Sequence, residues 1–322
     1  MYKRQEKGYP IAFGQLVFQN QASPAVVAPV ASAQGMQVIH GTFNLGVRTD
    51  NFSAIFSREN NGLLSLRYHG RELLKQPPAP LYWRALTDND TGCGFGYQSG
   101  LWLQASLFQR CVRTRIVEKR DSVTIVYTYQ LPMAEQASVV VSYTVRSDET
   151  IDVQADYHGA QELPDLPIFA ILLRMDADFN QFYYYGRGPE ENYIDRNCGA
   201  RLGIFSQKVV SNVSRYAVPQ ESGNRTGVRW VQVLNERGEG LCFAALDQPF
   251  ELGVSPYTAF ELQNALHSNE LPEIHYTNVT LAARQMGVGG DDSWGAPVHR
   301  AYHIDATGDI HFAFKISACT NG

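Results

Sequence analysis

Short runs of apolar and β-branched residues recur along most of the chain. The first run, Phe43–Val47, alternates with a period of two, which is typical of a half-buried strand. Turn-forming residues such as Asn60-Asn61-Gly62 separate the runs. We expect strands at 43–47, 52–56, 63–68, 122–129, 137–145, 150–157, 227–234, 276–281 and 310–316. Many short strands with few helices predict an all-β fold of antiparallel sheets packed as a sandwich.

One helix interrupts this pattern. Thr258 and Glu261 have the spacing of a capping box, and Leu262, Ala265 and Leu266 follow at helical spacing. We therefore expect a helix that begins just after residue 258.

The amino-terminal part differs from the rest. Residues 21–36 contain no charged side chain and are rich in Ala, Val, Pro, Ser and Gln, as in an extended linker. The run 11–18 before them predicts one strand without a partner, and an isolated strand is not stable in water. We expect the tail of a preceding domain at 1–20, a linker at 21–36, and one large β-sandwich domain at 37–322.

Composition narrows the possible functions. The chain has 44% hydrophobic and 18% charged residues, which is globular, and its net charge of −5 comes without a basic run. We therefore expect no nucleic-acid partner. No stretch approaches the ~18 apolar residues of a spanning helix and no signal peptide opens the chain, so we expect no membrane partner and a cytoplasmic location. Residues 1–5 do not resemble a domain start, so an export signal could have preceded them.

Cysteines and histidines give no sign of a metal or redox site. The five cysteines are scattered without a Cys-x-x-Cys pair, and we expect buried free thiols in a reducing compartment. The eight histidines lack metal-binding spacing. We also find no phosphate-binding loop and no G-x-S-x-G motif. The sequence predicts no side-chain metal ligands.

Four segments resemble motifs of the β-galactosidases of glycoside hydrolase family 2. In chain order they are Trp83–Asp90, Tyr185–Arg196, Tyr216–Arg225 and Met286–Trp294. The second is similar to the family's G-x-G-P-x-E-N-Y-x-D-R signature. The resemblance covers residues 37–322 and lies in the last domain of that family, which some members carry as a separate small subunit.

The resemblance implies a fold, a partner and a division of labour. The fold would be a galactose mutarotase-like β-supersandwich, preceded by a stub of an immunoglobulin-like domain. The partner would be the catalytic barrel portion or large subunit, which carries two catalytic glutamates; no strand–helix alternation of a barrel exists here. We therefore assign no catalytic residue to this chain and expect it to be inactive alone. The full enzyme would be an oligomer that cleaves galactosides such as lactose.

Cofactors are also implied only by resemblance. Mg²⁺ would belong to the absent catalytic domain. A structural Na⁺ could lie at backbone oxygens near Val218-Pro219 and the helix at 262–265.

Trp294 is the leading candidate for sugar binding. It follows Gly287–Gly290, and glycines can hold the positive φ values that project a loop outward. An indole face suits the C–H side of a sugar ring. The matching tryptophan of the family reaches into the active site. For Trp83, Trp102 and Trp230 we expect core or interface packing instead.

Polar residues of the same motifs are expected to support the loops. We predict a buried Arg–carboxylate network that fixes the loop, with direct sugar contact as the alternative, for Glu190, Glu191, Asn192, Asp195 and Arg196. Asp291 and Asp292 are the local candidates for a carboxylate pair. Adjacent turn residues usually point apart and bond nearby backbone amides, so we expect a structural role for both.

Two other classes of function remain open at this point. A stand-alone sugar epimerase of the mutarotase class would need a histidine acid and a carboxylate base, and the Asn-His dipeptide common in that class is absent. A non-catalytic carbohydrate-binding module is the other alternative. Four ordered motifs favour the β-galactosidase portion over both.

Overall fold

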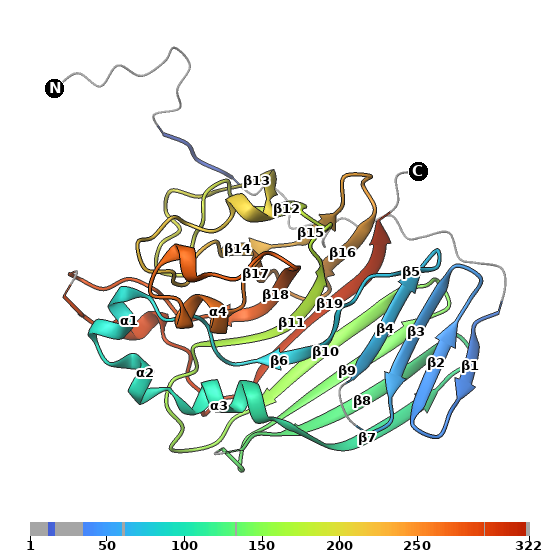
Figure 1. Cartoon of the computed structure of the whole chain (residues 1–322). Coiled ribbons are helices and arrows are strands. Elements are labelled where there is room, and N and C mark those ends of the chain that lie inside the picture. Colours follow the sequence, from blue (N-terminus) through green and yellow to red (C-terminus); the bar gives the residue numbers. More distant parts are fainter. Residues whose placement is uncertain (1–11, 17–34, 60–61, 133, 293, 320–322) are drawn as a thin grey trace.

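The computed structural model describes residues 12–16, 35–59, 62–132, 134–292 and 294–319 (Figure 1). The first of three sheets contains, in this order, β1 (Gln37–His40), β2 (Asn44–Arg48), β3 (Phe52–Ser57), β4 (Leu63–Tyr68) and β5 (Arg71–Glu72). Every strand pair in it is antiparallel.

A nine-stranded antiparallel sheet forms the largest layer. Its order is β13 (Arg201–Lys208), β12 (Gln181–Gly188), β15 (Trp230–Leu234), β16 (Gly240–Ala245), β19 (Ile310–Cys319), β10 (Ile151–His158), β9 (Ser138–Arg146), β8 (Ser122–Gln130) and β7 (Arg110–Glu118). The third sheet has the order β14 (Arg225–Val228), β17 (Phe250–Ser255), β18 (Tyr276–Gln285), β11 (Ile168–Asp176) and β6 (Gln76–Leu81).

The helices lie at one end of the molecule (Figure 1). They are α1 (Asp88–Gly92), α2 (Phe95–Gln98), α3 (Leu101–Phe108) and α4 (Ala259–Asn264). Short 3₁₀ turns occupy Val209–Ser211, Ser268–Glu270 and Arg300–Tyr302. In the part of the chain that the structure describes, no helix has both the length and the apolar character needed to cross a membrane.

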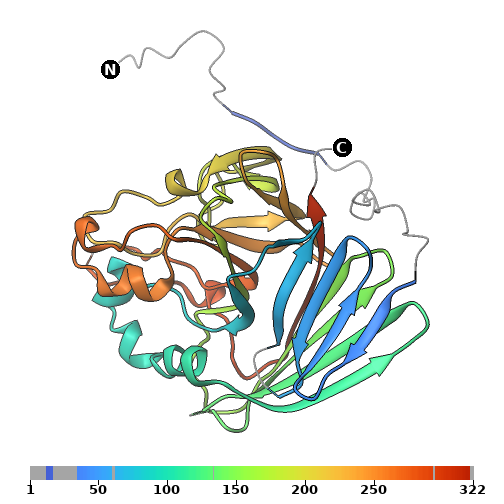
Figure 2. The same ribbon diagram turned by 45° about the vertical axis from the view of Figure 1, so that its right-hand side comes forward.

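Alternation of side chains builds the core between the sheets. On β8, Val123, Ile125 and Tyr127 are fully buried, while the positions between them are half-buried. Figure 2 shows β1 to β5 lying over the strands of the nine-stranded sheet, and Phe56 meets Tyr143 across this layer with ring centroids 5.7 Å apart. The all-β antiparallel supersandwich expected from the sequence is confirmed.

The prediction of one strand at 227–234 is wrong, because this run contains parts of two strands that belong to different sheets. Residues up to Val228 belong to β14 in the third sheet, and Trp230 begins β15 in the nine-stranded sheet. Gly227 has a φ of +62°, which a residue with a side chain rarely adopts. This bend lets one run of chain serve both layers.

The predicted helix after residue 258 is confirmed as α4. The hydroxyl of Thr258 accepts from the Glu261 amide, and the Glu261 carboxylate accepts from the Thr258 amide. Helices α1 to α3 were not predicted. In α1, Thr87 and Asp90 form a second capping box with aspartate in place of the usual glutamate or glutamine.

The predicted domain tail at 1–20 and linker at 21–36 lie mostly outside the described residues. Within them, residues 12–16 are described and form no strand, although 11–18 was expected to be one. The Gln15 side chain instead donates to the Leu202 carbonyl and accepts from the Leu202 amide, both at 2.7 Å, on edge strand β13.

The five cysteines are free, but the expectation that all are buried is wrong. Cys242 is buried, Cys198 is exposed, and Cys93, Cys111 and Cys319 are intermediate. The tryptophan predictions hold better: Trp83 and Trp102 are buried and Trp230 is half-buried. The indole N–H of Trp83 donates to the Gln263 side chain, and that of Trp102 donates to the Pro164 carbonyl.

Candidate functional site

A glycine-rich segment, Gly287–Gly290, is fixed at its base by two side chains from distant motifs. One Asp195 carboxylate oxygen accepts from the amides of Val288 at 2.9 Å and Gly289 at 2.7 Å. Arg84 donates to the Gly287 carbonyl at 3.1 Å. A Cβ on Gly287 would lie 2.6 Å from that Asp195 oxygen, so only glycine allows this close approach.

Arg84 belongs to a buried ion pair. Its guanidinium donates to both Asp90 oxygens, at 2.6 and 3.2 Å, and the two side chains are 2% and 1% exposed. Burial tends to lower the pKa of Arg84, but the nearby Asp90 and Glu221 outweigh it and raise that pKa. The same Asp90 carboxylate caps α1 by accepting from the Thr87 amide. Arg84 therefore keeps its positive charge in the interior, at the base of the Gly287–Gly290 segment.

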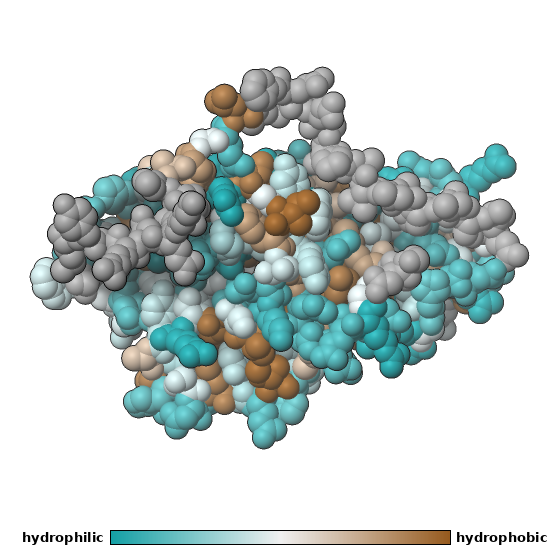
Figure 3. Space-filling model, turned by 90° about the horizontal axis from the view of Figure 1, so that it is seen from above, coloured by the Kyte–Doolittle hydropathy of each residue, from teal (hydrophilic) through white to brown (hydrophobic). Residues whose placement is uncertain are grey.

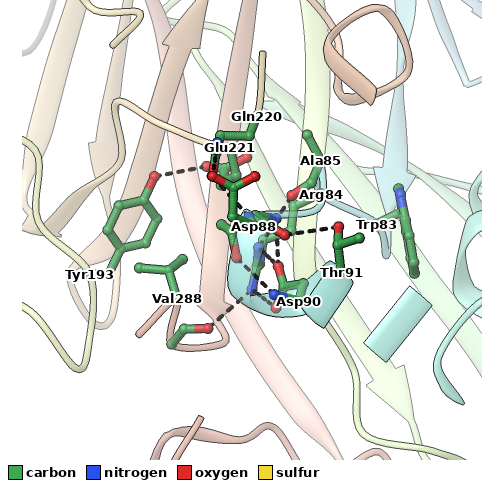
Figure 4. A network of polar contacts seen from close by, with 12 residues as sticks. Trp83, Arg84, Ala85, Asp88, Asp90, Thr91, Tyr193, Gln220, Glu221 and Val288 are labelled. Carbon is green, nitrogen blue, oxygen red and sulfur yellow. Dashed lines mark hydrogen bonds and ion pairs between the residues drawn. The ribbon is translucent and has the colours of Figure 1, made fainter. Parts of the chain in front are cut away.

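The third motif joins this cluster through Gln220 and Glu221 (Figure 4). The Gln220 side chain accepts from the Asp88 amide at 3.0 Å and donates to the Asp88 carboxylate at 3.1 Å. Tyr193 donates to Glu221 at 3.2 Å. Burial raises the pKa of Glu221, against the opposing influence of Arg84. Four segments that are far apart in sequence therefore meet in one polar network.

Trp294 lies at the end of the same loop and is 88% exposed. Its amide donates to an Asp292 carboxylate oxygen at 2.8 Å, and the Ala296 amide donates to the same oxygen at 3.1 Å. Gly295 has a φ of +102°, and a Cβ on it would lie 2.6 Å from the backbone of Gly92 on α1. Close packing of these two glycines holds the loop against α1 while the indole faces outward.

Asp291 and Asp292 have different partners. Asp292 binds the backbone amides just described, whereas Asp291 accepts from His299 at 2.7 Å and is largely exposed. The two carboxylates are therefore committed to separate contacts within the loop.

The residues of the 190–196 segment divide into three groups. Asn192 is buried; its amide group donates to the Arg187 and Glu190 carbonyls at 3.0 Å and accepts from the Thr226 amide. The Glu190 side chain is exposed. Asp195 holds the loop as described above.

Glu191 and Arg196 form the remaining ion pair of that segment, at 2.6 Å. Arg196 is 53% exposed, so this pair lies at the surface and not in the interior as expected. Glu191 also accepts from the Gly223 amide at 2.7 Å and so ties two loops together.

Sequence reasoning did not single out four charged residues of this network, which are the buried Arg84, Asp90 and Glu251 and the half-buried Glu221. Glu251 accepts from the Asn224 side chain at 2.8 Å, and burial raises the pKa of Glu251 to about 7. One signal was available, because Glu251 interrupts the apolar run Phe250–Val254. Arg84 and Asp90 lie only six residues apart in the first motif, but their contacts to Gly287 and Glu221 appear only when the separate segments come together.

Metal-binding capacity is limited among the described residues, where no group of three or more His, Cys, Asp or Glu side chains could hold an ion. The predicted Na⁺ would use backbone oxygens, the ligand type that suits hard cations. At the predicted position, the Val218 carbonyl already accepts from Gln220 at 3.3 Å. The Na⁺ site stays a prediction.

Residues 48–316 match the family model described as beta galactosidase small chain. The chain belongs to this family. Among curated members it is 46% identical to a beta-galactosidase of Halalkalibacterium halodurans over 316 residues, which are 97% of this chain but 31% of that protein. It is 38% identical to a beta-galactosidase small subunit of Latilactobacillus sakei, covering 88% of this chain and 98% of the relative. This member of the small-chain family therefore spans about a third of its long relatives and nearly all of a separate small subunit.

The solved structures that align with this chain share little sequence identity with it. Galactose 1-epimerase from Lactobacillus acidophilus aligns over 90% of this chain and 100% of its own, with 6% identity and a TM-score of 0.47. This likeness carries no argument about activity.

Proposed function

We propose that this chain is the carboxy-terminal portion, or the small subunit, of a β-galactosidase that hydrolyses terminal β-D-galactosides such as lactose. Membership in the small-chain family and the names of its relatives support this proposal. In it, the chain completes the sugar pocket and stabilises the assembly. These names do not favour a stand-alone epimerase. A cytoplasmic location remains part of the proposal.

The exposure of Trp294 is the observation on which the proposed role in the sugar pocket rests. A large apolar side chain left 88% exposed on a loop fixed by Asp195 and Arg84 is suited to contact something outside this chain. A rigid indole can pack against the C–H face of galactose while its N–H remains free for a polar group. The fixed base keeps the entropic cost of ordering the loop on binding small.

Hydrolysis requires two carboxyl groups on opposite sides of the glycosidic bond. The two carboxylates nearest Trp294 in sequence, Asp291 and Asp292, are held by His299 and by backbone amides. We therefore assign both catalytic glutamates, and the Mg²⁺ expected with them, to a catalytic barrel portion or large subunit. In this view the assembled enzyme is an oligomer, and the isolated chain is inactive.

Reconstitution tests this division of labour. The 322-residue chain alone should not cleave a chromogenic galactoside, and addition of a catalytic large portion should restore cleavage. Turnover by the chain alone would refute the proposal, as would a failure of the two parts to associate.

Trp294→Ala should lower kcat/KM of the reconstituted enzyme by about tenfold, since loss of aromatic packing costs roughly 1 kcal/mol or more. Phe43→Ala is the matched control, because Phe43 is an aromatic residue that is 67% exposed and directly precedes β2. Strand β2 lies at the opposite end of the molecule from α1 (Figure 1). Equal kinetics for the two variants would remove Trp294 from the sugar pocket.

A further inference from the structure

A cavity of about 310 Å³ lies between the third sheet and the helices that cover it. Strands β6, β11, β17 and β18 provide its floor, and α3 and α4 provide its walls. Trp294 is not among the described residues that line it, so the cavity is distinct from the exposed indole. Its volume falls at the lower end of the range for small-molecule sites, roughly 300–1,000 Å³.

Small residues on the sheet create this space. Gly253 on β17 and Ala79 on β6 both line the cavity. Beside them, Leu81 and Ile168 belong to a small apolar cluster that is separate from the main core. The floor of the cavity is therefore partly apolar.

Residues with carboxyl, guanidinium and amide side chains line the same cavity. Glu221, Arg84 and Asn278 all line the cavity, and Arg84 and Asn278 are at least nine-tenths buried. Arg174 donates to the Asn278 side-chain oxygen at 3.0 Å, and the Asn278 side-chain nitrogen donates to the Ser255 carbonyl at 3.2 Å, so this amide is held in one orientation. Planar donors and acceptors of this kind can bind pairs of neighbouring hydroxyl groups.

The charge of the lining argues against an ionic ligand. Arg84 is neutralised by its pair with Asp90 at 2.6 Å. The two other charged residues that line the cavity, Arg174 and Glu221, have opposite formal charges. A ligand with an apolar face, several hydroxyl groups and no net charge matches both the floor and the rim. We propose that this cavity binds a single neutral sugar ring.

Gly253→Val is the decisive variant. A Cβ on Gly253 would meet the Thr280 Cβ at 3.5 Å, an ordinary contact, and its φ is not positive. Thr280 lies directly opposite Gly253 in the sheet and lines the cavity, so the new side chain points into it. Gly46→Val on β2 is the matched control, because its Cβ also makes an ordinary contact, 3.7 Å from the Ile39 Cβ.

Calorimetric titration of the 322-residue chain with D-galactose and with D-glucose tests the proposal. At least one sugar should bind saturably, Gly253→Val should weaken that binding by about tenfold or more, and Gly46→Val should leave it unchanged. Absence of saturable binding, or equal binding by Gly253→Val, would overturn the proposal. Tighter binding of cyclohexanol or of galactose 1-phosphate would also overturn it, since these probes lack the hydroxyl set or add charge.

Two further measurements keep the test independent of folding and of the proposed enzyme function. Thermal unfolding of each variant checks the fold, and if Gly253→Val does not fold, Leu107→Trp fills the cavity from α3, where Leu107 is 49% exposed. Trp294→Ala should bind the sugar as tightly as the unmodified chain. Loss of binding in Trp294→Ala would assign the sugar to the exposed indole and refute the cavity site.

Discussion

Glu251 lies on β17 with its carboxyl surrounded by protein. Its oxygens accept from the Asn224 side chain at 2.8 Å and the Gln285 amide at 3.3 Å. Burial is the main cause that raises the pKa of Glu251 to about 7, and nearby Asp195 adds to it. Because this pKa exceeds the ordinary value of 4.5, the folded chain binds the proton more tightly than the unfolded chain.

The sign of this linkage predicts a loss of stability as pH rises. The protonated carboxyl contributes fully below pH 4.5, and the contribution falls between 4.5 and about 7, by on the order of 3 kcal/mol. Glu251→Gln stays neutral, so its unfolding free energy relative to the unmodified chain should increase from pH 5 to pH 8 in urea titrations. Exposed Glu190→Gln is the control, and a pH-independent difference for Glu251→Gln would contradict the prediction.

The ion pair of Arg84 and Asp90 gives a second prediction for single residues. Asp90→Ala leaves a buried guanidinium without its carboxylate and should lower the unfolding free energy by about 3–5 kcal/mol. Arg196→Ala, which breaks a half-exposed pair, should cost less than about 1 kcal/mol. Urea unfolding measures both, and similar costs for the two would show that burial of the first pair has no energetic consequence.

Among the elements, those with local signals were the ones predicted. Strand β4 was predicted at its observed bounds because its apolar run ends at turn residues on both sides. The run Leu101–Phe108 was missed as α3 because it is apolar nearly all round and has no capping side chain. The break between β14 and β15 was missed because Gly227 stands at the start of the predicted run and a single glycine gives little warning of a bend.

That bend predicts a specific cost for Gly227→Ala. Its φ of +62° disfavours any Cβ, while the nearest atom to a built Cβ is 3.7 Å away, so the cost comes from the backbone alone. We expect a loss of about 1–2 kcal/mol in unfolding free energy. Gly199→Ala, in open space without a positive φ, should change stability by less than about 0.5 kcal/mol. Equal stability of the two variants would mean that the bend tolerates other residues.

At the scale of the whole molecule, the fold class followed from local patterns, but the network beneath Trp294 did not. Trp294 itself could be singled out because glycines precede it along the chain. Glu221 and Arg84 meet only after β14, α1 and the Gly287–Gly290 segment converge, and no periodicity encodes such a meeting. The cavity beneath α3 and α4 likewise depends on which strands become neighbours.

The contact of Gln15 with β13 has a consequence for how these molecules behave in concentrated solution. Edge strand β13 presents backbone groups to which a strand from another molecule could add. The side-chain amide of Gln15 occupies both groups of Leu202 as a neighbouring peptide would. A segment remote in sequence thereby interrupts the template at that residue, which protects the chain against edge-to-edge aggregation.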